Sequence, residues 1–189
     1  RGRPMTAEHT QDAITPIAAS KSAAASIIAG YIRTFGIDAV IVRPFNSVGP
    51  RQNPGSYAGI IPIVIQRVAA GLPIEITGDG NQTRDFIYVK ETVDLIVRAY
   101  EVVESRGLAI NVATGLETSI NDLFRGLLDV LDAPDHPIIY TPERAGDVRR
   151  HCADVSRARE LLGLHPHPLS KPQLRETIDY YLGGDSVGG

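Results

Sequence analysis

The stretch DAVIVRPF at residues 38–45 decides the fold, because it is a nearly continuous run of apolar, largely β-branched side chains that ends in a proline and an aromatic residue. Runs of this kind are typical of strands that are buried on both faces of a parallel sheet. Residues 22–35, just before it, carry apolar side chains at helical spacing and end at Gly36, which predicts an amphipathic helix. A helix followed at once by such a strand predicts an α/β protein.

Helices and strands continue to alternate along the rest of the chain. Apolar side chains at helical spacing predict helices at 91–100 and 174–181, and capping or stop residues predict helices at 60–70, 119–131 and 154–163. Short apolar runs predict strands at 74–76, 84–89, 108–113 and 138–140. Ser119 with Asp122 is interpreted as a capping box, and Asp154 as a helix cap. Only 108–113 is a plausible parallel neighbour for 38–45, so the chain resembles the latter part of a larger sheet.

Composition excludes several classes of function. The 189 residues carry 22 acidic and 19 basic side chains, a net charge of −3, with no basic block that would bind nucleic acid. No apolar run approaches the roughly 20 residues of a membrane helix, and the N-terminus is too polar for a signal peptide. Cys152 is the only cysteine, which favours the cytoplasm. The five histidines lack the spacing of metal ligands, so no metal is expected.

Polar side chains follow the predicted strand 38–45. The strand breaks at Pro44 and leads through Asn46 to Arg51 in a segment rich in Gly and Pro, at the carboxyl edge where α/β proteins bind ligands. A plain capped turn is the alternative interpretation. The helix start after Gly59 offers unpaired N–H groups to a phosphate, although every helix has such an end.

Two arginines far apart in the sequence are candidates for an anion site. Arg84 follows a turn with two glycines, and Arg144 lies in a loop shortly before Asp147. Their planar guanidinium groups can converge on a diphosphate, while Asp147 can accept a hydrogen bond from a ribose or a base. Surface salt bridges are the alternative for each of them. Lys21 opens a long helix, where its charge opposes the helix dipole, and this indicates some other use for it.

Six stretches, taken together and in order, resemble the extended short-chain dehydrogenase/reductase family, and in particular its NAD-dependent, UDP-glucose 4-epimerase-like nucleotide-sugar epimerases and dehydratases. They are PIAASK at 16–21, RPFNSVGPRQ at 43–52, GIIP at 59–62, GDGNQTRDFIYV at 78–89, NVATGLETSI at 111–120 and RAGDVRRHCAD at 144–154. Each stretch is moderately specific, but their order covers nearly the whole chain.

The resemblance implies an architecture for the chain. It would be the latter part of a Rossmann-type parallel sheet together with a smaller α/β substrate-binding subdomain. Residues 1–58 and 90–115 would belong to the Rossmann side, and 59–89 and 116–182 to the substrate-binding side. Residues 183–189 would form a flexible tail.

The resemblance also implies roles for individual residues. Lys21 would be the lysine of the family's Tyr-x-x-x-Lys pair, and Pro44 and Phe45 would lie near the nicotinamide. The sugar nucleotide would be held by Asn46 at a phosphate, by the helix start at Ile61, by Arg84 and Arg144 around the diphosphate, and by Asp147 at the nucleoside.

Two features depart from the family pattern. The position of the catalytic tyrosine is Ile17, whose alkyl side chain has no proton to exchange. The Gly-rich turn that binds the dinucleotide is absent, so NAD or NADP would be bound mainly by a region not present in this chain. The chain is therefore interpreted as a fragment, as one half that another chain completes, or as a degenerate relative.

The sequence thus leads to one functional hypothesis and two alternatives. The leading one is an NAD-dependent UDP-sugar 4-epimerase, with this chain carrying the sugar-nucleotide site. The alternatives are a non-catalytic sugar-nucleotide-binding relative, because of Ile17, and a nucleotide-sugar 4,6-dehydratase. A nucleotide sugar, with a UDP-sugar favoured, and a second copy of the chain are the expected partners, and neither nucleic acid nor a membrane is.

Overall fold

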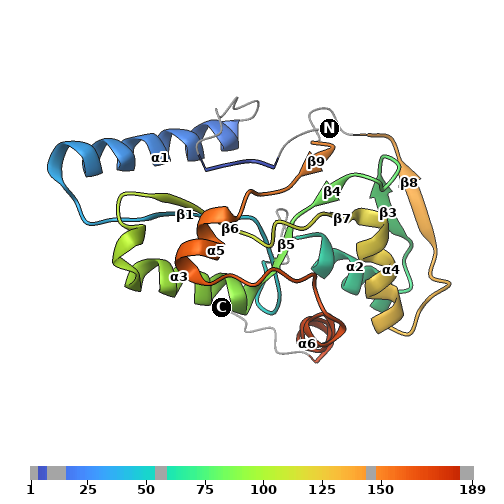
Figure 1. Cartoon of the computed structure of the whole chain (residues 1–189). Coiled ribbons are helices and arrows are strands. Elements are labelled where there is room, and N and C mark those ends of the chain that lie inside the picture. Colours follow the sequence, from blue (N-terminus) through green and yellow to red (C-terminus); the bar gives the residue numbers. More distant parts are fainter. Residues whose placement is uncertain (1–3, 8–15, 54–58, 144–147, 184–189) are drawn as a thin grey trace.

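The computed structural model describes residues 4–7, 16–53, 59–143 and 148–183 (Figure 1). The helices are α1 (Pro16–Phe35), α2 (Ile60–Ala69), α3 (Val89–Glu101), α4 (Ile120–Val130), α5 (Ser156–Leu162) and α6 (Lys171–Leu182), with a 3-10 turn η1 (Val103–Ser105) after α3. None of the described helices is long and apolar enough to cross a membrane. The tail expected at 183–189 lies outside the described residues except for Gly183.

The strands form small sheets that are mostly parallel, as expected for this fold class. The strands are β1 (Ile41–Pro44), β2 (Asn46–Val48), β3 (Ile74–Thr77), β4 (Thr83–Arg84), β5 (Phe86–Tyr88), β6 (Ala109–Val112), β7 (Thr118–Ser119), β8 (Ile138–Thr141) and β9 (Arg150–His151). The pairs β1–β6, β2–β5, β3–β8 and β4–β9 are parallel, and β4–β7 is antiparallel. The prediction that 108–113 is the parallel neighbour of 38–45 is therefore confirmed.

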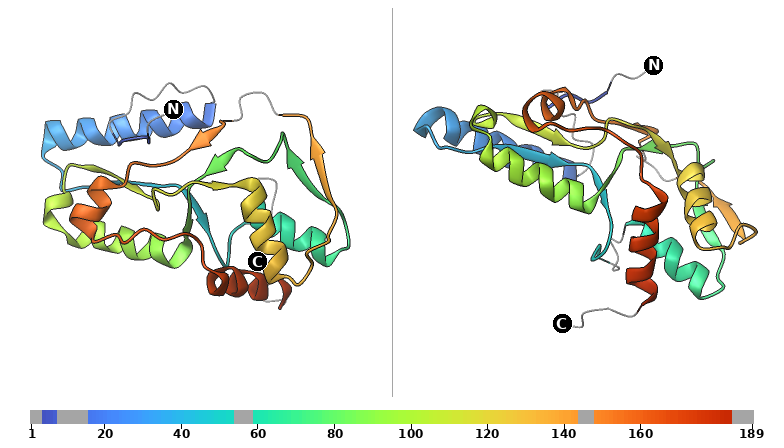
Figure 2. Two further views of the ribbon diagram at one scale, coloured as in Figure 1. Left: turned by 45° about the vertical axis from the view of Figure 1, so that its right-hand side comes forward. Right: turned by 60° about the horizontal axis from the view of Figure 1, so that its bottom comes forward.

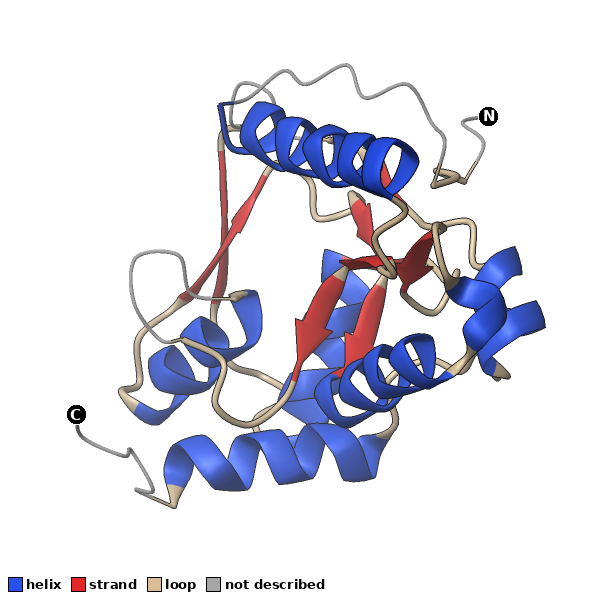
Figure 3. Ribbon diagram, turned by 90° about the vertical axis from the view of Figure 1, so that its left-hand side faces the viewer, coloured by secondary structure: helices blue, strands red, loops and turns tan. Residues whose placement is uncertain are grey.

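The β1–β6 pair lies between two helices, with α1 on one side and α3 on the other (Figures 1 and 3). The expectation that the 38–45 strand is buried on both faces is wrong for the described chain. Ile41 and Val42 are only half-buried and Pro44 is exposed, because β6 is the one described strand beside β1. Helix α1 also begins earlier than expected, at Pro16, and ends as predicted at Gly36, whose φ is +63°.

Two segments differ from their predicted secondary structure because of contacts at Asp85. The strand expected at 84–89 is split into β4 and β5, and α3 already begins at Val89. The segment expected to carry Asn46 as a loop instead forms β2, because both its backbone N–H and its side-chain amide donate to the carbonyl of Asp85, at 3.3 and 2.9 Å. The chain therefore passes from the end of β1 at Pro44 directly into β2, which forms a second parallel pair with β5.

Three helix starts show which capping signals the sequence carries. At α4, Ser119 accepts a hydrogen bond from the N–H of Asp122, but the carboxylate of Asp122 accepts from the hydroxyl of Ser119, so the expected capping box is only half formed. Val155 occupies the N-cap position of α5, but the carboxylate of Asp154 accepts from the N–H of Ser156 at 2.9 Å, so Asp154 supplies the predicted cap. A complete capping box stands at α6, between Ser170 and Gln173, which the sequence reading missed.

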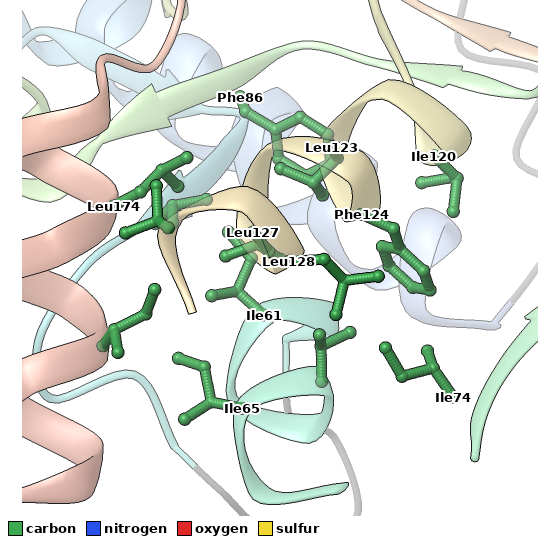
Figure 4. Packing of buried hydrophobic residues seen from close by; sticks show 14 of the residues in the cluster. Ile61, Ile65, Ile74, Phe86, Ile120, Leu123, Phe124, Leu127, Leu128 and Leu174 are labelled. Atoms are coloured by element: carbon green, nitrogen blue, oxygen red, sulfur yellow. The ribbon is translucent and has the colours of Figure 1, made fainter. Parts of the chain in front are cut away.

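Two hydrophobic clusters divide the described chain. The larger one joins α2, β3, α4 and α6, and its centre is formed by side chains such as Ile61, Phe124 and Leu127, which are at most 1% exposed (Figure 4). The smaller one joins α3, β6 and α5 around Ile87 and Ile110. Figure 2 shows these two groups of helices toward opposite ends of the molecule, with β2, β4 and β5 running between them.

Asp85 holds the segment between the two clusters. Its side chain is fully buried, and its carboxylate accepts four hydrogen bonds: from the N–H and hydroxyl of Thr114 at 2.9 and 2.6 Å, from the N–H of Gly115 at 2.9 Å and from the N–H of Ala153 at 3.2 Å. A buried carboxylate is tolerated only when donors surround it in this way. One side chain thus fixes β4, the end of β6 and the approach to α5 together.

An ion pair between Glu117 and Arg150, together with a hydrogen bond from Thr83, holds β4 on the surface of the molecule. The carboxylate of Glu117 accepts from the hydroxyl of Thr83 at 2.7 Å and forms a two-armed ion pair with Arg150, whose Nε lies at 2.9 Å. This arrangement joins β7, β4 and β9 across the sheet. The hydrogen bonds from Arg150 and Thr83 lower the pKa of Glu117 from 4.5 to about 2, because they stabilise the charged form.

Replacing Asp85 by alanine should destabilise the fold strongly, because three backbone N–H groups and one hydroxyl would lose their acceptor in the interior. We expect the free energy of unfolding, measured by urea denaturation, to fall by about 3 kcal/mol or more. Asp94→Ala, on the exposed side of α3, is the matched control and should change it by less than about 0.5 kcal/mol. Equal stability of the two variants would contradict the anchoring role of Asp85.

Acid should weaken the contribution of Glu117. Because its pKa is lower in the folded chain than in the unfolded one, the pair stabilises the fold fully above about pH 4.5 and loses this effect as the pH falls toward 2. Urea denaturation at pH 6 should therefore show Glu117→Gln to be less stable than the unmodified chain, with a difference that shrinks below pH 4. A difference that does not depend on pH would show that the charge of Glu117 is not what matters.

Candidate functional site

A cavity of about 950 Å³ lies along the boundary of the larger hydrophobic cluster. Its walls come from β2, the start of α2, β3, the segment from 82 to 86 and the start of α4. The polar side chains that line it are those of Asn46, Ser47, Gln52, Arg67, Glu75, Thr77, Gln82 and Arg84. The remaining walls are apolar, so the cavity has the mixed character of a small-molecule site.

The extended segment around β4 and β5 directs alternate side chains into this cavity. Gln82, Arg84 and Phe86 line the cavity, whereas Thr83 bonds to Glu117 and Asp85 is turned toward Thr114. Alternation of this kind is the ordinary period of an extended chain. Because the hydrogen bonds of Asp85 hold its side chain away from the cavity, the side chains of Arg84 and Phe86 on either side of it point into the cavity.

Asn46 and Arg84 come close because β2 pairs with β5, and Arg84 in β4 lies two residues before β5 begins. In the parallel β2–β5 pair, Asn46 is opposite Phe86, two residues after Arg84. The side-chain N–H of Asn46 donates to the carbonyl of Asp85, which leaves its side-chain oxygen directed elsewhere. Arg84 donates through Nη1 to the carbonyls of Thr83 and Val148, at 2.8 and 2.6 Å, so its guanidinium is positioned by backbone.

The start of α2 reaches the same cavity. Gly59, at the N-cap, has no side chain to bond the first N–H groups of the helix, and Gly59, Ile60 and Ile61 all line the cavity. A Cβ at Gly59 would overlap the amide end of the Gln52 side chain, which would have to move to make room for it. The unpaired N–H groups of a helix start attract negative charge, here at the edge of a cavity that also contains Arg84.

The remaining predicted site residues are placed as follows. Phe45 lines the cavity and stacks against His151, with ring centroids 4.7 Å apart. Lys21 is exposed on α1, and Pro44 is exposed at the end of β1. Ile17 lies in the first turn of α1. Arg144 and Asp147 lie outside the described residues.

Several polar residues of the cavity were missed from the sequence. Gln82 had a usable signal, because it precedes Arg84 by two residues in an extended segment and must share its face. Thr77 and Gln52 had none, because only the folding of β3 and the 49–52 segment brings them to the cavity. The structure thus adds Gln52, Thr77 and Gln82 to the predicted pair of Asn46 and Arg84.

Two groups near the cavity are held in their neutral forms. Burial, with a smaller contribution from the charge of Arg84, lowers the pKa of His151, which favours the uncharged imidazole. Burial raises the pKa of Cys152 to about 11, so its thiol is not activated as a nucleophile. Among the described residues, no group of three or more His, Cys, Asp or Glu side chains is arranged to hold a metal ion.

Comparison with protein families and with known proteins identifies relatives of the chain. Residues 2–113 match the model of the "NAD dependent epimerase/dehydratase family". The chain is similar to UDP-glucose 4-epimerase of Mycolicibacterium smegmatis, with 36% identity over 167 residues, which cover 88% of this chain and 53% of the relative. The chain therefore spans about half the length of this curated relative.

Solved structures give the same relationship. UDP-glucose 4-epimerase of Thermotoga maritima with UDP-glucose superposes with a TM-score of 0.88 at 30% identity, over 97% of this chain and 58% of that one. A dTDP-glucose 4,6-dehydratase of Streptomyces venezuelae with NAD bound superposes with a TM-score of 0.87 at 25% identity, over 97% of this chain and 56% of that one. The matches confirm the predicted family and the predicted α/β fold class.

Proposed function

The chain belongs to the NAD-dependent epimerase/dehydratase family, and we propose that it carries the sugar-nucleotide site of a 4-epimerase that acts on a UDP-sugar. The observation that supports this most directly is the convergence of Asn46, Arg84 and the start of α2 on one cavity. These groups come from three separate elements, and all of them can serve a negatively charged, oxygen-rich ligand. The 4-epimerase type is favoured because UDP-glucose 4-epimerases are among the most similar relatives and structures.

The chemistry of the cavity suits the diphosphate of a nucleotide sugar. Arg84 supplies a fixed positive charge with several N–H donors, which matches the oxygens of a phosphate. The N–H groups at the start of α2 add donors with the favourable end of the helix dipole. The apolar walls around Ile61 and Phe124 exclude water and strengthen these interactions. Arg144 is proposed as a second diphosphate ligand and Asp147 as a nucleoside ligand.

The family resemblance assigns three of the described residues to the nicotinamide end of the cofactor. Phe45 presents a ring at the cavity, Pro44 ends the neighbouring strand, and Lys21 is exposed on α1. We propose that these three residues contact NAD, which when bound accepts a hydride from the sugar and returns it. The chain has no Gly-x-Gly-x-x-Gly turn, so most of the cofactor would be bound by a region outside this chain.

Ile17 supports a second candidate function. It occupies the position one helical turn before Lys21 where the family resemblance places a tyrosine, and an alkyl side chain cannot accept the proton of a sugar hydroxyl. A protein with this site would bind a sugar nucleotide without turning it over. The 4,6-dehydratase alternative rests on relatives such as the Streptomyces enzyme and needs the same proton transfer.

The assembly and the internal division of the chain are also proposals. The apolar side chains of Ile27, Tyr31 and Phe35 on α1 are 53 to 69% exposed, which supports pairing with a second copy through this helix. Sedimentation of the chain would test the homodimer.

We further propose that residues 1–58 and 90–115 serve the cofactor side and 59–89 and 116–182 the substrate side.

Binding of UDP should stabilise the 189-residue chain, because a ligand that binds only the folded state shifts the unfolding equilibrium. At a UDP concentration about 100 times the Kd, the gain is about 2.7 kcal/mol, seen as a rise of several degrees in Tm. Arg84→Ala should reduce this rise markedly by removing charge-assisted bonds to the diphosphate. Arg125→Ala, an exposed ion-paired arginine on α4, is the control and should retain it. No rise at millimolar UDP would contradict the proposal.

The identity of residue 17 should control turnover. In a protein that joins these residues to a dinucleotide-binding half, conversion of UDP-glucose to UDP-galactose should be about 10²- to 10⁴-fold slower than in a form with a tyrosine, because a positioned acid/base group is missing. Ile17→Tyr should restore activity, and Ile17→Phe, which adds the ring without the hydroxyl, should not. Robust turnover by the unmodified protein would show that another group acts as the base.

A further inference from the structure

Gln82 carries a hydrogen-bonding group that has no partner in the described part of the chain. Its side chain is 8% exposed and lines the cavity. Its Nε2 donates to the carbonyl of Thr77 at 2.7 Å, whereas its Oε1 is buried and has no partner among the described residues. A buried acceptor without a donor is costly, by about 1 to 3 kcal/mol, and native proteins keep few of them.

The orientation of the Gln82 amide is fixed by its neighbour. The carbonyl of Thr77 can only accept, so the NH₂ end of the amide must face it and the oxygen must face away. The backbone of Gln82 is fixed as well, because its carbonyl accepts from the N–H of Ile120 at the start of α4, at 3.1 Å. The side chain is therefore held as an acceptor in the wall of the cavity.

The chemistry of this acceptor restricts which part of a ligand can satisfy it. The oxygens of an ionised diphosphate accept hydrogen bonds and do not donate them, so they cannot serve Oε1. Hydroxyl groups and N–H groups can. Gln82 and Arg84 share one face of an extended segment, roughly 6.6 Å apart along it. A ligand whose diphosphate reaches Arg84 therefore places one of the two groups attached to the diphosphate, the nucleoside or the sugar, within reach of Gln82.

We propose that Gln82 is a specificity-determining residue that accepts a hydrogen bond from a donor group of the nucleoside, either a ribose hydroxyl or a base N–H. This inference rests on the proposed function, and it assigns different parts of the ligand to different residues of the cavity. Arg84 and the start of α2 bind the charge that all nucleoside diphosphates share. Gln82 recognises the nucleoside attached to that charge.

Calorimetric titration of the 189-residue chain with UDP and with inorganic pyrophosphate tests this division. Gln82→Leu should weaken UDP binding about five- to tenfold, the loss expected for one hydrogen bond, and should leave pyrophosphate binding within twofold. Arg84→Ala should weaken both ligands. Gln66→Leu, which changes an exposed glutamine of α2 that does not line the cavity, is the matched control and should change neither.

Two UDP analogues identify the donor. With 2′-deoxy-UDP, Gln82→Leu should cause no further loss if the ribose 2′-hydroxyl is the partner, and N3-methyl-UDP tests the base N–H in the same way. Either result supports the proposal. Equal weakening of UDP and pyrophosphate by Gln82→Leu would overturn it, as would unchanged binding of UDP.

A measurement on the unmodified chain covers the case in which Gln82→Leu does not fold. The side-chain amide signals of Gln82 in a nitrogen-15 correlation spectrum should shift with UDP and stay in place with pyrophosphate; the same response to both ligands would overturn the proposal. If the unmodified chain binds no UDP, the proposed function fails and this inference with it. If it binds UDP and depends on Arg84 but not on Gln82, only this inference fails.

Discussion

The buried carboxylate of Asp85 is the interaction on which the arrangement of the site depends. It accepts four hydrogen bonds from Thr114, Gly115 and Ala153, and its own carbonyl accepts from Asn46. A carboxylate in the interior cannot give up these donors without a large loss of free energy, so its position is firmly determined. The residues on either side of it must then face the opposite way, into the cavity.

The cavity results from this anchor and from the separation of the two hydrophobic clusters. The larger cluster holds α2, α4 and α6 together and presents the start of α2 to the cavity, while the smaller one holds β6 and α5 in place behind Asp85. Polar groups from distant parts of the sequence therefore meet at the boundary of an apolar core. Such a boundary combines fixed donors with exclusion of water, which is what recognition of a charged ligand needs.

The sequence predicted a substantial part of this arrangement. Helical spacing together with capping and stop residues predicted all six α-helices of the described chain, and the apolar runs predicted the β1–β6 pair with its parallel direction. Asn46 and Arg84 were singled out from their places after a strand and a glycine turn, and the structure brings them to one cavity. The break at Asp85 was not predicted, because an acidic residue inside an apolar run does not reveal whether its partners lie in water or in the interior.

By itself, the sequence determined the family, the fold class and the absence of a tyrosine at position 17, because these follow from residue identity, period and order along the chain. Only the tertiary structure decided that Gln52 and Thr77 line the same cavity as Arg84, and that one oxygen of Gln82 has no described partner. The physical reason is that period specifies which face of an element a side chain occupies, whereas its hydrogen-bond partners come from elements far away in the sequence.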